Sequence, residues 1–150
     1  MNQRFFWIWV ICVIGTPLLW FNFFKGDIVK VQRPNSTTYI NASKDVISVS
    51  LPFPGAVTGK NFSVIGQARG LWFFEATFPL ELVDTKGNLV ARTVAHAESD
   101  WMTENLVPFT ADFKVPETFI GQATLVLKKD NPSGLAEYDA SMSFPINVEY

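Results

Sequence analysis

Hydrophobic and polar residues alternate with a period of two over most of the chain from residue 45 onward. Alternation of this kind puts one face of a strand against a core, and helical spacing is not found in this region. Turn-forming residues separate the stretches, so we predict an all-β fold, an antiparallel β-sandwich of about seven short strands. The alternating stretches are residues 47–51, 62–68, 80–82, 89–97, 109–115, 123–127 and 142–148.

The beginning of the chain follows a different pattern. Residues 5–24 contain no charged side chain, and a helix of this length would be about 30 Å long, the thickness of a bilayer's hydrocarbon core. Trp7, Trp9 and Trp20 lie toward its ends, where aromatic rings favour the membrane interface. A cleaved signal peptide is the alternative, but it would have a shorter apolar core and small residues before the cleavage site. We therefore expect an N-terminal transmembrane helix within residues 1–24, with the following domain on the extracytoplasmic side of the membrane.

Residues 25–45 mix polar, charged and turn-forming side chains, which is typical of a tether. Within this tether, Thr38, Tyr39 and Ile40 are expected to form a short extended piece. The folded domain is placed at residues 46–150, so that it is leashed near the membrane instead of being fixed to it.

Charge is distributed unevenly along the chain. Residues 1–43 carry four basic and one acidic side chain, a net charge of +3, whereas residues 44–150 carry eight basic and thirteen acidic ones, a net charge of −5. An acidic domain without a cluster of lysine and arginine argues against nucleic acid as a partner. Cys12 is the only cysteine, so the domain has no intrachain disulfide and depends on its core for stability.

Three unusual segments fall in loops that an antiparallel topology brings to one end of the domain. If consecutive strands are antiparallel, the loops after the second, fourth and sixth strands share that end. These loops are residues 70–73, 98–107 and 130–139. We also expect the tether to enter the domain at this end, which would then face the membrane or a membrane-proximal partner unless the tether folds back.

The same three loops contain the candidate binding residues. Trp72 and Trp101 are interpreted either as platforms on which a ligand stacks or as side chains that close the core. Because Glu75 follows four apolar residues, we expect it to be partly buried and to latch the last loop by accepting hydrogen bonds from residues 131–134. The candidate binding residues are Trp72, Phe73, Glu75, Asp100, Trp101, Asn131 and Ser133.

Six segments of the domain carry a resemblance to a known family. They are residues 52–55 (PFPG), 66–76 (GQARGLWFFEA), 84–87 (DTKG), 100–102 (DWM), 107–109 (VPF) and 130–134 (DNPSG). With these segments in order, residues 47–148 resemble the immunoglobulin-like domain of bacterial spore germination proteins. The resemblance implies an extracytoplasmic immunoglobulin-like sandwich without known enzymatic activity, held at a bacterial cell membrane.

Catalytic and metal-binding groups are scarce in the sequence. His96 is the only histidine and no nucleophile elbow is present, so we expect no enzymatic activity and no cofactor. A calcium site is an alternative for the carboxylates of the loops, although their spacing follows no known calcium loop. Its ligands would be Glu75, Asp100, Glu104 and Asp130.

Three functions are open at this point. The main prediction is a membrane-tethered, non-catalytic binding or adhesion module that engages an envelope protein or a cell-wall polymer through the loops at one end. The alternatives are a structural spacer or assembly domain, and a calcium-assisted carbohydrate-binding module. Exposure of more than about a third of Trp72 and Trp101 would favour recognition, and their burial would favour the spacer.

Overall fold

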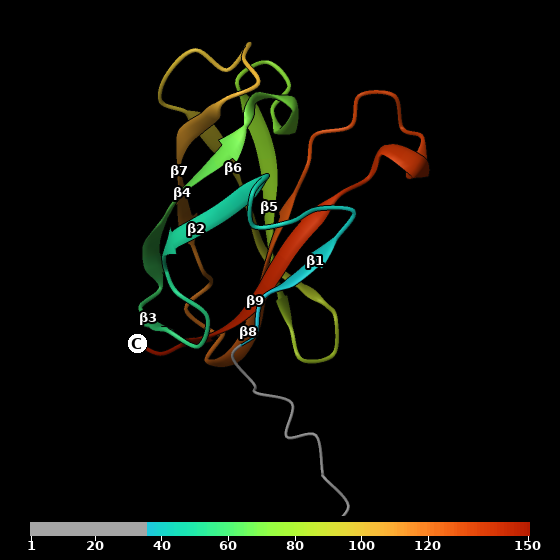
Figure 1. The fold of residues 1–150 in the computed structure, drawn as a ribbon. Helices are drawn as coiled ribbons and strands as arrows, with labels where there is room; N and C mark the ends of the chain where they lie inside the picture. Colours follow the sequence, from blue (N-terminus) through green and yellow to red (C-terminus); the bar gives the residue numbers. More distant parts are fainter. Residues whose placement is uncertain (1–35) are drawn as a thin grey trace, which may run out of the picture. The chain divides into compact units, whose positions relative to one another are not determined.

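The computed structural model describes residues 36–150, and almost all of their regular structure is β-strand (Figure 1). Two single 3₁₀ turns, η1 (Gly70–Trp72) and η2 (Ala136–Tyr138), interrupt the strands. The predicted all-β fold is confirmed, and its seven stretches correspond to β2 and to β4 through β9. The strands are β1 (Thr38–Ile40), β2 (Ile47–Leu51), β3 (Val57–Thr58), β4 (Asn61–Arg69), β5 (Thr77–Asp84), β6 (Leu89–Ala97), β7 (Leu106–Lys114), β8 (Gly121–Lys128) and β9 (Ser141–Val148).

The nine strands form one curled and mostly antiparallel sheet. Its hydrogen-bonded order is β1-β9-β8-β5-β6-β7-β4-β2, and β3 adds a short parallel pairing with the end of β9. β6 and β7 pair only at His96 with Thr110 and at Ala97 with Phe109. Along the rest of their length β6 and β7 do not pair with each other, which allows the sheet to curl around a core.

The predicted membrane helix at residues 5–24 lies outside the described residues. Between residues 36 and 150, no helix has the length and apolar character needed to cross a membrane.

β1 comes from the segment that the sequence analysis placed in the tether. The extended piece expected there is an edge strand, since Thr38 pairs with Ser143 and Ile40 with Ser141. β9 begins at Ser141, directly after the loop of residues 130–139, so antiparallel β1 runs toward that loop. The first strand of the predicted domain, β2, begins at the loop end as expected, since Ile47 pairs with Ala68 just before the first loop. The chain reaches this end along β1, however, so the tether comes to the sheet from the side away from the loops.

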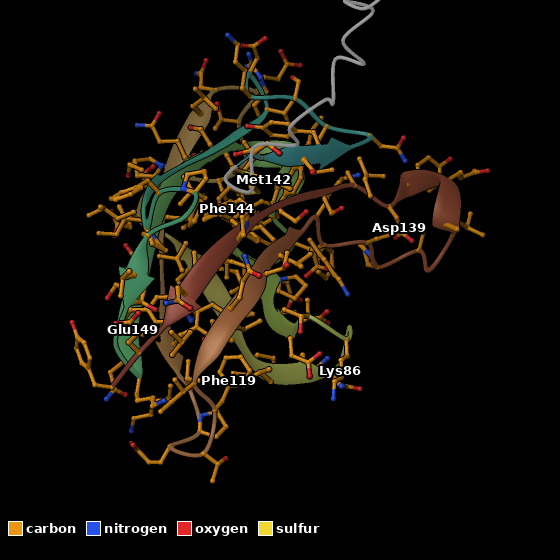
Figure 2. The ribbon with its side chains drawn as sticks, turned by 90° about the horizontal axis from the view of Figure 1, so that it is seen from below. Lys86, Phe119, Asp139, Met142, Phe144 and Glu149 are labelled. Atoms are coloured by element: carbon orange, nitrogen blue, oxygen red, sulfur yellow. The ribbon has the colours of Figure 1, made fainter. Side chains whose placement is uncertain are left out.

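Alternating side chains build the core as the sequence pattern predicts. Figure 2 shows Met142 and Phe144 on β9, which follows the projecting loop that carries Asp139. Met142, Phe144, Ile146 and Val148 are all buried, while the residues between them are more exposed. Four aromatic side chains of the core, Trp72, Phe73, Phe78 and Phe109, pack together near the three-loop end. Phe113 stacks on Phe62 toward the other end of β4 and β7.

The hairpin turn between β5 and β6 is held by one carboxylate. Asp84 accepts hydrogen bonds from the backbone amides of Lys86 and Asn88 and from the Asn88 side-chain amide, at 2.8, 2.8 and 2.9 Å. The hydrogen bond from the Asn88 side chain, followed by that from its backbone, lowers the pKa of Asp84 below its ordinary value. The turn therefore favours the ionised carboxylate.

This turn makes folding sensitive to acid. A lowered pKa in the folded state gives a stabilisation that is fully present above the ordinary pKa of Asp84 and is lost as the pH falls through the folded value. We expect the free energy of unfolding to decrease between about pH 6 and pH 2, with a smaller slope in Asp84→Asn. Chemical denaturation at each pH measures the slope, and exposed Glu117→Gln is the control. Equal slopes for Asp84→Asn and the native protein would contradict this role of the turn.

Candidate functional site

Three loops meet at one end of the sheet, at the top of Figure 1, as the antiparallel topology predicts. The backbone amide of Asp130 donates to the carbonyl of Trp72 at 3.1 Å, which joins the first loop to the third. A hollow of about 500 Å³ lies between the loops and takes its walls from all three. It is lined by Gly70, Leu71, Phe73, Phe74, Trp101, Met102, Thr103, Glu104, Lys129, Asp130 and Pro132.

Gly70 allows the first and second loops to touch. A Cβ atom at this position would lie 1.9 Å from the carbonyl oxygen of Thr103 and 2.2 Å from that of Trp101. No side chain fits at such distances, so glycine is required for the close approach of the two backbones. The sequence shows Gly70 as the start of a loop, but only the structure shows what packs on it.

Trp72 and Phe73 belong to the core below the hollow. Their exposed fractions are 1% and 4%, and both rings pack edge to face on Phe78, with centroid distances of 6.3 and 5.1 Å. Trp72 is therefore not available to stack on a ligand, and it closes the core. Trp101 is partly buried against the same core, so neither tryptophan meets the exposure expected of a platform.

The chain reverses direction immediately after Phe74. Glu75 and Ala76 have φ values of +49° and +63°, and reciprocal hydrogen bonds of 2.9 and 3.0 Å join Phe74 to Thr77. Two successive residues with positive φ are typical of a type I′ turn, a conformation that glycine and asparagine tolerate and that strains most other residues. The turn presents the ring of Phe74, which is 42% exposed, at the rim of the hollow.

Glu75 does not latch the last loop. Its side chain is exposed at the tip of this turn and makes no hydrogen bond to any other residue within 36–150. The prediction of a buried carboxylate is wrong, because the four apolar residues before it do not continue as one strand. Asn131 and Ser133, the predicted donors to Glu75, have other partners.

Asn131 and Ser133 hold their own loop together. The Asn131 side-chain amide donates to the carbonyl oxygen of Leu135 and to the carboxylate of Asp139, both at 2.8 Å. The Ser133 hydroxyl donates to the Asn131 side-chain oxygen at 2.6 Å. These bonds shape the projecting loop, whose side chains are largely exposed.

The second loop is shaped in a similar way by Asp100. Its carboxylate accepts a hydrogen bond of 3.0 Å from the backbone amide of Met102, which leaves the Met102 side chain 77% exposed. Asp100 is thus a loop-forming residue that lies beside the hollow without lining it.

Leu71 and Met102 are the features of the site that sequence reasoning missed. Leu71 is 79% exposed, and it was not among the candidate residues, although Trp72 and Phe73 of the same apolar run were. Together with Phe74, these two side chains make an exposed apolar rim around the hollow. The available signal was the run of four large apolar residues, which is longer than one face of a strand can bury.

The carboxylates of the loops do not form the alternative calcium site. In the described part of the chain, no three His, Cys, Asp or Glu side chains are grouped so that they could hold a metal ion. Glu75, Asp100, Glu104 and Asp130 are therefore separate carboxylates around the loop end.

The comparisons with known proteins give one family. Residues 46–136 match the Gmad2 family model, described as the immunoglobulin-like domain of bacterial spore germination. The match covers more than half of the chain and runs from the start of β2 to η2. No match was found among curated proteins or among solved structures.

A side chain at Gly70 should separate the first two loops. We expect Gly70→Ala to lower the free energy of unfolding by about 1–3 kcal/mol, because the new Cβ overlaps two backbone carbonyls. Urea denaturation measures the loss, and Gly59→Ala, whose Cβ would meet its nearest neighbour at 3.4 Å, is the control. A loss no larger than that of the control would show that the loops do not depend on this approach.

Relief of the turn strain should stabilise the domain. We expect the double substitution Glu75→Asn with Ala76→Gly to raise the free energy of unfolding by about 1 kcal/mol, because Asn and Gly tolerate positive φ. Glu75→Ala alone should change it by less than about 0.5 kcal/mol, since the carboxylate makes no contact to lose. If Glu75→Ala instead lowers the free energy of unfolding by about 1–3 kcal/mol, the carboxylate does hold the last loop as first predicted.

Proposed function

Because the chain belongs to the family of immunoglobulin-like domains of bacterial spore germination, we propose that it is a non-catalytic binding module of a bacterial envelope protein. In this proposal, residues 5–24 anchor the chain in the membrane and the sandwich domain lies on the extracytoplasmic side. The domain engages a protein partner through the end at which its three loops meet.

The observation that carries the proposal is the exposed apolar rim of Leu71, Phe74 and Met102 around the hollow. Large apolar side chains gathered at one exposed site mark a surface that another molecule covers. The hollow of about 500 Å³ has room for one or two large side chains of a partner. Two of the three rim side chains, Leu71 and Met102, are not aromatic, and Trp72 is buried in the core, so the rim fits a protein better than it fits a cell-wall polymer.

The strained turn supports the same surface. Two non-glycine residues with positive φ destabilise a fold, and such strain is found preferentially where a residue must be presented in one geometry. Here the turn at Glu75 and Ala76 fixes Phe74 beside the hollow.

The burial of Trp72 favours a second candidate, a structural spacer without a ligand of its own. In that case the loop end would contact nothing, and the apolar rim would be incidental. The two candidates differ in whether a partner lies against Phe74 and Met102.

Site-specific photo-crosslinking in the native host distinguishes these candidates. We expect benzoylphenylalanine at the position of Met102 to give a light-dependent adduct with a protein, and the adduct to disappear when Phe74→Ser is added. The control position is Ile120, which is 69% exposed in the turn before β8, at the other end of the sheet. Equal labelling from positions 102 and 120, or labelling from neither, would favour the spacer.

A stability measurement separates binding from folding in this experiment. Phe74→Ser should lower the free energy of unfolding by less than about 2 kcal/mol and leave the domain folded, because the ring is already 42% exposed.

A further inference from the structure

We infer that the partner segment received by the three-loop hollow is cationic, a polypeptide stretch whose large apolar side chains are flanked by lysine or arginine. This inference rests on the proposed function, since it names the chemistry of the partner at the same surface. The apolar rim gives the place of contact, and the distribution of charge selects the occupant.

All the excess negative charge of the described residues lies at the loop end. Residues 70–76, 98–105 and 129–139 together carry seven acidic and one basic side chain, a net charge of −6. The rest of residues 36–150 carries six acidic and seven basic side chains, a net charge of +1. The eight charged residues of the loops are Glu75, Glu98, Asp100, Glu104, Lys129, Asp130, Glu137 and Asp139.

Ion pairs within the domain do not neutralise this charge. The salt bridges among residues 36–150 both belong to Glu81, which lies on β5 and outside the loops. At the edge of the loop end, Arg69 donates from its guanidinium to the backbone carbonyls of Asp45 and Glu104 and not to a carboxylate. Lys129 approaches only the backbone carbonyl of Tyr138, at 3.4 Å. The loop carboxylates are therefore not neutralised by ion pairs within the described residues, and their negative charge can act on a partner.

The field acts directly at the hollow. Glu104 and Asp130 line it together with Lys129, and Glu75 stands on the turn beside Phe74, so that acidic groups outnumber the one cation. At physiological ionic strength, charges within about 8 Å still interact, so flanking cations of a seated segment would be attracted. An apolar rim alone would not exclude anionic lipid head groups or phosphate-rich polymers as partners. The negative charge of the loops repels both.

Selection from a library of random peptides of about twelve residues tests the inference. The full chain is reconstituted in phosphatidylcholine nanodiscs, and peptides that bind the Phe74→Ser, Met102→Ser variant are removed first. We expect the enriched peptides to combine large apolar residues with a net charge of about +2 or more. Their affinity should fall about tenfold when the salt concentration rises from about 50 to about 500 mM.

A matched pair of variants isolates the role of charge. Glu75→Gln with Glu104→Gln should weaken the best peptide about threefold to tenfold, because both carboxylates stand at the hollow. Glu117→Gln with Glu149→Gln removes the same charge from outside the three loops and should leave the affinity unchanged.

The outcomes separate the inference from the proposed function. Enrichment of neutral or acidic peptides, or equal effects of the two variant pairs, would overturn the cationic partner and leave the binding surface intact. If no peptide binds the native chain better than it binds the Phe74→Ser, Met102→Ser variant, both the inference and the proposed function fail.

Discussion

The packing of aromatic rings around Phe78 is the interaction on which the loop end depends. Phe78 is fully buried in β5, where it meets Trp72 and Phe73 from the first loop and Phe109 from β7, the last at a centroid distance of 4.9 Å. Edge-to-face contacts of this kind add to the stabilisation from apolar burial. They tie an irregular segment to two strands, so the loop is fixed from below by the core. A binding surface built on this cluster does not have to be ordered by its partner, which reduces the entropic cost of association.

The same arrangement explains why the apolar run divides between two roles. Trp72 and Phe73 point into the core, whereas Leu71 and Phe74 lie at the surface on either side of them. One short segment therefore stabilises the fold and offers a contact surface. The charges of the domain follow a similar division, because the strands are nearly neutral and the three loops are strongly acidic. At the loop end, the buried side chains stabilise the fold and the exposed ones are left for recognition.

Much of this architecture could be predicted from the sequence, because alternation with a period of two has a direct physical cause in the strand. Seven strands and the shared end of the three loops follow from that pattern and from antiparallel topology. The turn at Glu75 and Ala76 could not be predicted, since it lacks the Asn-Gly signature of two-residue hairpins and depends on tertiary packing of Phe73. The role of Gly70 was hidden for a similar reason, because the backbone that packs on it is about thirty residues away in sequence. Pairing of β1 with β9 joins segments separated by about one hundred residues, and three residues are too few to show an alternating pattern.

The direction of β1 has a mechanical consequence. This strand lies at the edge of the sheet, begins at Thr38 and runs toward the loop end beside β9. If a partner holds that end while the chain is pulled from before Thr38, the tension runs along the axis of β1. The hydrogen bonds to β9 would then be loaded together in shear and would not open one after another. The three-residue strand β1 is thereby the first element to bear an applied force. Its few hydrogen bonds to β9 would set the force at which the sheet begins to open.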